Sequence, residues 1–259
     1  MRLIIITICY NNLPDLLRTI DSVDAQTRLP DEHWIINGSS QMDIANWFIE
    51  HPVPTFRKIL NEPDNGISDA FNKGIQLAGS GMIQLLNAGD TLLNASVLAE
   101  VEAFLQKNKD VSWISGKIVL KRGGSWIEIG KAFEQNKLYR GMRSIAHPSW
   151  WVHKHAYQKA GPYQSQYKIA MDYDMMCRLA HEPYAYIPLA MVRFDDSGIS
   201  TNHYLQSLQE NQQVYESYVG FSLKCRIWQL RLRSLHYALQ TYPGKLLFRM
   251  KQKLGGENW

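Results

Sequence analysis

Short apolar runs alternate along the chain with segments whose apolar residues recur every three or four positions. Leu3–Cys9 is a continuous apolar run rich in β-branched residues and predicts a buried parallel strand, whereas the spacing in Asn11–Val23 predicts an amphipathic helix. Further strands are predicted at His33–Ile36, Thr55–Leu60, Met82–Leu86, Val111–Ile114 and Lys117–Leu120, and further helices at Asp43–Ile49, Ser68–Leu77, Ser96–Lys107 and Met171–Ala180. This alternation favours an α/β fold with a Rossmann-like, mostly parallel sheet flanked by helices.

The pattern changes after Gly123. Trp126–Arg143 predicts irregular structure, and the chain from Tyr204 onward predicts helix, with a break at Tyr242–Gly244. The sequence contains no internal repeat and no low-complexity tract. We therefore expect one domain over residues 1–203 and a C-terminal helical extension over residues 204–259.

Charge is distributed unevenly along the 259 residues, whose formal net charge is +4. Between Glu216 and Glu257 there is no acidic residue, while that segment holds eight cations: Lys224, Arg226, Arg231, Arg233, Lys245, Arg249, Lys251 and Lys253. An apolar stripe accompanies them, formed by Trp228, Leu232, Leu235 and Leu239. Basic amphipathic helices of this kind lie on anionic membrane surfaces, so residues 222–253 are a candidate membrane contact. The alternative is a helix packed on the domain with a solvated charged face. Nucleic acid is not an expected partner, because the rest of the chain is acidic and no nucleic-acid motif accompanies the basic segment.

The number of cysteines and the lengths of the apolar runs indicate the cellular compartment of the protein. The three cysteines are far apart and odd in number, which argues against a disulfide framework. No run approaches the roughly 18 apolar residues of a membrane span, and Leu3–Cys9 is too short for a signal-peptide core. These features predict a reduced, cytoplasmic protein.

Polar loops follow the predicted strands, where ligands bind in such folds. The loop Tyr10–Asn12 lacks the glycines of a dinucleotide fingerprint, which argues against an NAD or FAD enzyme. Thr7, Tyr10 and Asn11 can instead hydrogen-bond to and stack on a nucleoside, or simply form a capped turn. Asn37–Ser40 offers groups suited to a base edge or ribose, although these residues are also ordinary turn formers. After Met82–Leu86 comes Asp90, an isolated carboxylate of the kind that binds a divalent cation between phosphates, or a helix or turn cap.

Several segments together carry a family resemblance: CYNN, NGSS, EPDNGISDAFNKGI and LNAGD, then AHPSWW around His147, AMDYD at Ala170–Asp174 with Arg178, and SGIS at Ser197–Ser200. In this order they resemble family 2 glycosyltransferases of the GT-A fold, over about the first 200 residues. The resemblance implies a nucleotide-binding part over about 1–120 and an acceptor part over about 121–203. It implies an inverting transfer of a sugar from a nucleotide-sugar, which we expect to be a UDP-sugar, to a glycan or lipid-linked acceptor in bacterial surface-polysaccharide biosynthesis. With the basic segment, it suggests a peripheral location at the inner face of the cell membrane.

The resemblance also implies roles for individual residues. The nucleotide-binding positions are Thr7, Tyr10, Asn11, Asn37, Asp64, Gly66, Asp69 and Asn72. The family usually has aspartate where this chain has Asn37, whose amide can still pair with a uracil edge. The D-x-D metal motif of the family is reduced to Asn87 and Asp90, with Asp90 as the Mg²⁺ or Mn²⁺ ligand and Asn87 as a weaker one.

Asp172 is the predicted general base. Asp174 and Arg178 are spaced i, i+4 on a helix and are expected to form a surface ion pair, which leaves Asp172 free to face the cleft. By the resemblance it deprotonates the acceptor hydroxyl, whereas the alternative is that it only complements the helix dipole. His147, Trp150 and Trp151 are acceptor-side candidates or, for the tryptophans, core residues. His203 is a further candidate for the diphosphate or metal.

Two other functions are compatible with the same residues. A membrane-associated protein that binds nucleotide-sugars without transferring them is favoured by Asn37 and the reduced metal motif. A nucleotidyltransferase would need a glycine-rich, basic phosphate loop after the first strand, which CYNN lacks.

Overall fold

One continuous sheet organises the computed structural model, which describes residues 1–122, 124–142, 145–194 and 203–241. The described strands are β1 (Leu3–Cys9), β2 (Glu32–Asn37), β3 (Arg57–Asn61), β4 (Met82–Leu85), β5 (Thr91–Leu92), β6 (Trp113–Arg122), β7 (Ser125–Ile129), β8 (Trp151–His153) and β9 (Tyr184–Arg193). They lie in the order β3-β2-β1-β4-β8-β6-β9-β5, with β7 paired to β6 beside this path. The first half of the sheet is parallel and consists of β3, β2, β1 and β4. Strand β8 pairs antiparallel with β4 on one side and with β6 on the other, and so connects the two halves of the sheet. The predicted α/β class, with a mostly parallel sheet flanked by helices, is confirmed.

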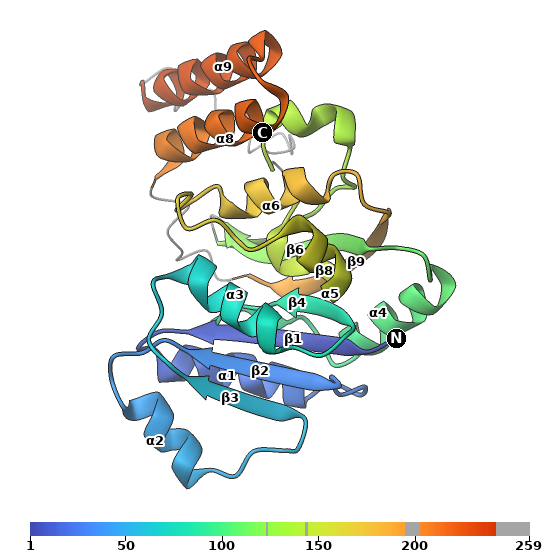
Figure 1. Cartoon of the computed structure of the whole chain (residues 1–259). Helices are drawn as coiled ribbons and strands as arrows, with labels where there is room; N and C mark the ends of the chain where they lie inside the picture. Colours follow the sequence, from blue (N-terminus) through green and yellow to red (C-terminus); the bar gives the residue numbers. More distant parts are fainter. Residues whose placement is uncertain (123, 143–144, 195–202, 242–259) are drawn as a thin grey trace.

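Helices cover both faces of this sheet (Figure 1). The described α-helices are α1 (Leu13–Asp24), α2 (Asp43–Glu50), α3 (Ile67–Leu77), α4 (Val97–Lys107), α5 (Lys154–Ala160), α6 (Met171–Leu179), α8 (Tyr204–Val219) and α9 (Leu223–Gln240), and two 3₁₀ turns are η1 (Gln135–Arg140) and η2 (His147–Ser149). Strand β1 shows why its sequence is apolar throughout. Ile4 and Ile6 pack into the core under α3 and α6, while Leu3 and Ile5 pack into the core under α4. Both faces are buried, so no position alternates with a polar residue.

Close packing of α3 on β1 depends on one glycine. A Cβ on Gly74 would lie 2.4 Å from the side chain of Ile6. The helix can approach the sheet this closely only because this position has no side chain.

The sequence predicted the first 107 residues well and the middle of the chain poorly. The strands expected at Val111–Ile114 and Lys117–Leu120 are one strand, β6, whose pairing with β9 shifts register around Lys117. The stretch Trp126–Arg143, expected to be irregular, contains most of β7 and all of η1. Strands β5, β8 and β9 and helix α5 were not predicted, and β9 contains Pro188, which weakens any local strand signal.

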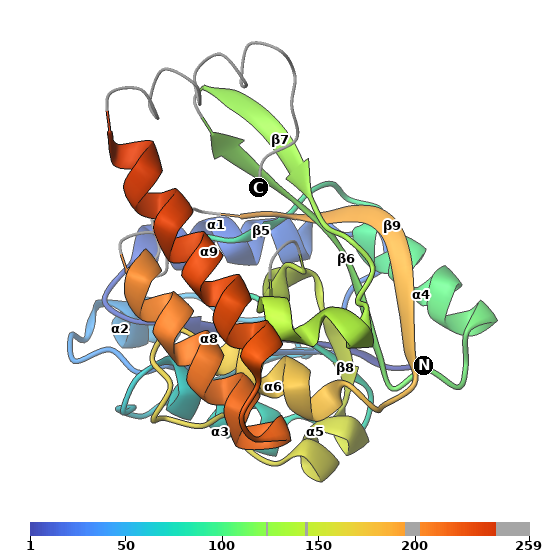
Figure 2. The same cartoon turned by 90° about the horizontal axis from the view of Figure 1, so that it is seen from above.

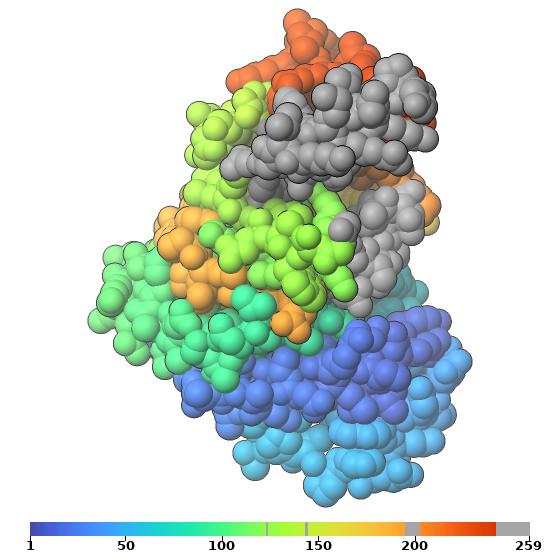
Figure 3. Space-filling model, turned by 180° about the vertical axis from the view of Figure 1, so that it is seen from behind, coloured from blue at the N-terminus to red at the C-terminus, as the bar shows by residue number. Residues whose placement is uncertain are grey.

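The described part of the helical extension is packed on the domain. Helices α8 and α9 form an antiparallel pair, with α8 against α6 and α9 against η1 (Figures 1 and 2). Seen from behind, the blue N-terminal segments and the red α9 lie toward opposite ends of the molecule (Figure 3). Within the described residues no helix is long and apolar enough to cross a membrane.

Docking of α8 changes the environment of the predicted surface ion pair. Arg178 does bind Asp174, at 2.5 Å, but the Asp174 side chain is only 2 % exposed. The hydroxyl of Tyr218, from α8, donates to the other carboxylate oxygen at 2.7 Å. The prediction of a surface pair was wrong. The i, i+4 spacing indicates that the two side chains are in contact, but it does not indicate whether another helix packs over them.

Candidate active site

A cleft of about 510 Å³ opens where the β4–β5 loop, η2, the start of α6 and part of α8 converge. Four of the predicted site residues line it: Asn87, Asp90, His147 and Asp172. Helix α8 adds Ser207 and Asn211, which no sequence motif indicated. The cleft therefore combines residues from both halves of the chain and from the C-terminal extension.

Asp172 lies in the first turn of α6 and faces the cleft. Its Oδ1 lies 3.6 Å from Nε2 of His147 and has no hydrogen-bond partner among the described residues. Burial raises the pKa of the Asp172 carboxyl above its usual range, and the neighbouring His147 acts in the opposite direction. A raised pKa makes the carboxylate a better proton acceptor, as a general base requires.

His147 is held in place beside Asp172. It lies in η2, is 6 % exposed, and its Nε2 is 3.1 Å from the hydroxyl of Tyr163. Burial lowers the pKa of His147, while the Asp172 carboxylate raises it. Because burial is the larger effect, the ring is neutral at pH 7 and can exchange a hydrogen bond with a ligand or with Asp172.

Glu210 fixes the N-terminus of α6. This buried carboxylate of α8 accepts hydrogen bonds from the backbone N–H groups of Ile169 and Ala170, both at 2.9 Å. Gln206 donates to its second oxygen at 3.0 Å. Asp172 follows Ala170 by two residues, so a residue of the helical extension helps to set the position of the predicted base. The sequence offered no signal for this contact, which joins positions 40 residues apart.

Asn87 and Asp90 follow β4 in a tight loop that α1 holds from behind. The Thr19 hydroxyl donates to the backbone carbonyl of Asp90 at 2.8 Å, and the Gly89 N–H donates to Thr19 at 2.9 Å. The buried Oδ1 of Asn87 has no hydrogen-bond partner among the described residues. One carboxylate and one free amide oxygen suit Mg²⁺ or Mn²⁺ held largely by phosphates and water, as Mg²⁺ commonly is. No group of three or more His, Cys, Asp or Glu side chains placed to hold a metal occurs in the described part of the chain.

Most of the predicted nucleotide-binding residues gather at the carboxyl ends of β1, β2 and β3, outside the lining of the cleft. The Asn11 N–H donates to Ser39, and Asn37 bonds to the Ser39 N–H and to Asn61. The Asp64 carboxylate lies against Gly38, where a Cβ would meet it at 1.7 Å. Gly66, whose N–H donates to Asp64, and Asp69 lie at the start of α3, and Tyr10 is 62 % exposed beside this group. These loops form a polar edge able to receive a nucleoside.

Five predicted residues have surroundings that do not support their expected roles. Thr7 is fully buried, and its hydroxyl oxygen lies 3.0 Å from Nε2 of His33. The side-chain amide of Asn72 makes two hydrogen bonds with the backbone of Tyr163. Trp150 and Trp151 point to opposite faces of the sheet and pack in its two main cores. Exposed His203 precedes α8 and does not line the cleft. The sequence could not separate core from site here, because both use the same residue types.

Comparison with known proteins identifies the family of the chain. Residues 4–161 match the family model for glycosyl transferase family 2. A "PGL/p-HBAD biosynthesis glycosyltransferase" of Mycobacterium tuberculosis (strain ATCC 25177 / H37Ra) is 30% identical over 169 residues, which are 63% of this chain and 64% of that relative. A glycosyltransferase of M. tuberculosis (strain ATCC 25618 / H37Rv), named as uncharacterized, is 29% identical over 202 residues, 76% of each chain.

Solved structures share the fold at low sequence identity. S. aureus TarS 1–349 in complex with UDP-GlcNAc has a TM-score of 0.61 at 12% identity, covering 83% of this chain and 67% of that one. A mannosyltransferase from Pyrobaculum calidifontis in complex with GDP-Man and Mn²⁺ has a TM-score of 0.59 at 15% identity, covering 98% and 80%. The family model matches more than half of this chain, and the fold is that of GT-A glycosyltransferase structures. The chain therefore belongs to glycosyl transferase family 2, a family of transferase enzymes.

Proposed function

We propose that this protein transfers a sugar from a nucleotide-sugar donor, with UDP as the nucleotide, to an acceptor hydroxyl with inversion of the anomeric centre. The single observation that carries the proposal is the placement of Asp172, a cleft carboxylate whose pKa is raised by burial, in the same cleft as Asp90 and Asn87. Family membership and the UDP-GlcNAc complex of a protein with the same fold support the donor class.

The residues divide the reaction between them. Asp172 accepts the proton of the acceptor hydroxyl as its oxygen forms the new bond to the anomeric carbon. The bond from that carbon to the diphosphate breaks with its electron pair on the leaving oxygen, so the products are the glycoside, the nucleoside diphosphate and a protonated Asp172. Attack opposite the leaving group inverts the configuration.

Asp90 and Asn87 are the residues that would hold a divalent cation at the diphosphate. Such a cation supplies charge neutralisation for the leaving group when bound. Asp90 is 2 % exposed and its loop is tied to α1, so these two residues offer a fixed position for phosphates.

A donor-turnover assay tests the proposal. The purified chain is incubated with a panel of UDP- and GDP-sugars, with and without Mn²⁺, and released nucleoside diphosphate is measured. Asp172→Asn is expected to lower turnover about 10²–10⁴-fold, as is typical for loss of a general base, with donor affinity unchanged. The exposed Asp110→Asn is the matched control and keeps full turnover. Full turnover by Asp172→Asn would remove the base assignment. Donor binding by the wild type with no turnover of any donor would indicate a binding protein.

We also propose that α9 rests on an anionic membrane surface, where a glycan or lipid-linked acceptor of surface-polysaccharide biosynthesis is met. The stripe expected to contact lipid, formed by Trp228, Leu232, Leu235 and Leu239, is half-buried, and Trp228 packs edge-on against Tyr139 of η1. A second apolar stripe points outward instead: Leu223, Ile227, Leu230 and Tyr237 are 62 %, 59 %, 65 % and 57 % exposed and recur at intervals of four, three and seven residues.

Cations border this outer stripe on both sides. At 3.6 residues per turn, Lys224 and Arg231 lie along one edge of it, and Arg226 and Arg233 lie along the other. Arg226 is also bound to Glu216 at 2.8 Å. An apolar stripe between two rows of cations is the arrangement of a helix lying in a membrane interface, and it supports a cytoplasmic protein at the inner face of the membrane.

Vesicle co-sedimentation tests the membrane proposal. Ile227→Asp with Leu230→Asp is expected to lower binding to phosphatidylserine-containing vesicles at least tenfold, while Ile49→Asp, at a 79 % exposed position on α2, leaves it unchanged. Equal binding of wild type and double variant would refute the proposal, as would equal binding to phosphatidylcholine and phosphatidylserine vesicles.

A further inference from the structure

One basic side chain of the cleft has no role in the reaction described so far. Among the described residues that line the cleft, Lys168 is the one lysine or arginine. It lies in the segment that leads into α6, its side chain is exposed, and it makes no hydrogen bond or ion pair with another described residue. None of the sequence motifs included it.

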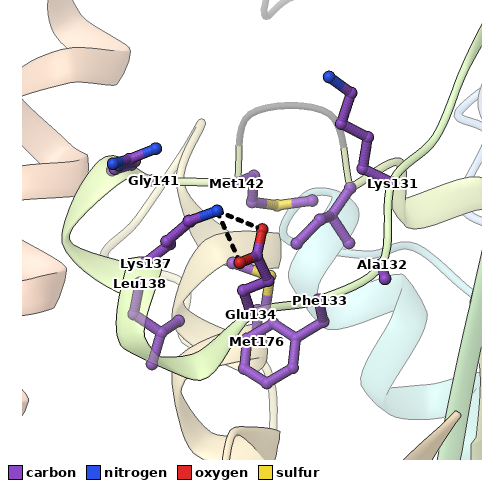
Figure 4. Close-up of a pocket in the computed structure, with 11 residues that line it drawn as sticks. Lys131, Ala132, Phe133, Glu134, Lys137, Leu138, Gly141, Met142 and Met176 are labelled. Atoms are coloured by element: carbon purple, nitrogen blue, oxygen red, sulfur yellow. Dashed lines mark hydrogen bonds and ion pairs between the residues drawn. The ribbon is translucent and has the colours of Figure 1, made fainter. Parts of the chain in front are cut away.

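Two other cations close to the cleft are already paired. Arg18 binds Asp15, a residue of the cleft lining, at 2.6 Å. Lys137 lines an adjoining pocket between η1 and α6, where it reaches both oxygens of Glu134 at 2.6 Å (Figure 4). Lys168 differs from both, because no described side chain binds it, and its ammonium group is therefore available to a ligand.

The backbone beside Lys168 is fixed by α8. Glu210 accepts hydrogen bonds from the backbone N–H groups of Ile169 and Ala170, both at 2.9 Å. These bonds also anchor the residues that follow, up to Asp172 in the first turn of α6. Lys168 and Asp172 therefore line the cleft from one anchored segment.

The start of α6 lies against the start of α3. The Ser68 hydroxyl oxygen of α3 lies 3.1 Å from the sulfur of Met171 in α6. Gly66, which directly precedes α3, belongs to the polar edge able to receive a nucleoside. A donor with its nucleoside at this edge and its anomeric carbon at Asp172 would have its diphosphate between the two, past the segment that carries Lys168.

The charge of the cleft favours a cation beside this diphosphate. The described lining holds three carboxylates, from Asp15, Asp90 and Asp172, against the single ammonium group of Lys168. Even with Arg18 offsetting Asp15, negative charge is in excess. A diphosphate adds further negative charge, and cleavage of its bond to the sugar places one more on the leaving oxygen. A cation held where charge develops lowers the energy of the transition state.

We propose that Lys168 binds the diphosphate of the donor and stabilises the negative charge that forms on the leaving oxygen. The bond from the anomeric carbon to that oxygen breaks with its electron pair on the oxygen, while the Lys168 ammonium donates hydrogen bonds to phosphate oxygens and keeps its protons. This inference rests on the proposed transferase function and adds a catalytic residue to it. A site with one carboxylate, Asp90, holds a divalent cation less firmly than a site with two, and Lys168 supplies positive charge from the chain itself.

Calorimetric titration of the full chain tests the binding role without requiring turnover. UDP and uridine are titrated in the presence of Mg²⁺ into the wild type, Lys168→Gln and Lys168→Arg. Lys168→Gln is expected to bind UDP about tenfold more weakly, because a charge-assisted hydrogen bond is lost, and to bind uridine as the wild type does. Lys168→Arg keeps the charge and is expected to bind UDP more tightly than Lys168→Gln. Lys109→Gln, at an exposed position between α4 and β6, is the matched control and keeps wild-type affinity for UDP.

Donor turnover tests the catalytic role. At saturating donor, Lys168→Gln is expected to lower kcat about 10²-fold, because removal of one donor group that stabilises a transition-state oxyanion has an effect of this size. A loss of UDP affinity with kcat unchanged would limit Lys168 to binding and would refute its catalytic role.

Failure of this inference and failure of the transferase function give different results. If Lys168→Gln matches the wild type in UDP affinity and in kcat, Lys168 does not contact the diphosphate, while turnover by the wild type still supports the transferase. Equal weakening of UDP and uridine binding, or wild-type binding of UDP no tighter than that of uridine, would also refute the inference. If Lys168→Gln loses affinity for UDP alone and no donor is turned over by the wild type, the diphosphate contact is supported and the transferase function is refuted.

Discussion

Glu210→Ala tests whether the C-terminal extension positions the general base. The substitution removes the carboxylate that accepts from the N–H groups of Ile169 and Ala170, both at 2.9 Å. A buried donor left without a partner costs about 1–3 kcal/mol, so two such donors lower the free energy of unfolding by about 2–6 kcal/mol. Since a domain is stable by only about 5–15 kcal/mol, the loss is large enough to measure and large enough to loosen the start of α6.

Loosening this turn moves Asp172, two residues further on. A misplacement of about 1 Å at a reacting group can lower the rate about 10²-fold. We expect kcat for donor turnover to fall by about this factor while KM for the donor is unchanged, because the polar edge at β1, β2 and β3 is not in contact with Glu210. This split separates a positioning role from a general loss of folded protein.

Denaturant unfolding and steady-state kinetics of three variants provide the measurement. Glu210→Gln keeps an acceptor oxygen and is expected to lose about 1 kcal/mol or less of the unfolding free energy, with kcat partly retained. Gln213→Ala, exposed on the same helix, is the control for changes in α8 itself. The reasoning is refuted if Glu210→Ala unfolds within 1 kcal/mol of wild type and keeps its kcat.

The remaining predictions concern single groups of the site and the core. Asp172→Asn is expected to raise Tm at pH 7, because burial raises the pKa of this carboxyl and so disfavours its charged form; an unchanged or lower Tm would count against that burial effect. For the same reason kcat/KM of the wild type is expected to rise with pH through a pKa above the ordinary aspartate value. The protonated carboxyl stabilises the folded protein at low pH, and this stabilisation is lost as the pH rises through the same raised pKa. A kcat/KM profile that is flat from pH 4 to 8 would contradict both expectations. Asp90→Asn is expected to abolish the additional thermal stabilisation that Mn²⁺ gives to the UDP complex, while UDP alone still binds. If the stabilisation by Mn²⁺ is unchanged, Asp90 is not a ligand of the metal. Gly74→Val is expected to lower the free energy of unfolding by about 1–3 kcal/mol, because its Cβ would lie 2.4 Å from Ile6; wild-type stability in urea would show that α3 can shift outward.

Two features of the site illustrate how far local sequence carries a prediction. Asp90 could be found because it follows a buried strand directly, and the carboxyl end of such a strand is where ligands bind in this class of fold. Glu210 could not be found, because it stands in a helix of ordinary composition and acquires its role only when α8 packs against α6.

The sequence by itself determined the strands and helices of the first 107 residues apart from the short strand β5, the family, and the identity of Asp90 and Asp172 as candidates. Those features depend on local periodicity or on an ordered set of motifs, and both can be read along the chain. Tertiary structure alone decided that the Asp174–Arg178 pair is buried, that the two tryptophans after Ser149 belong to the core, and that α9 turns a different apolar stripe outward. Helical spacing states which side chains share a face, but whether that face meets solvent, a partner helix or a ligand depends on what the rest of the chain packs against it.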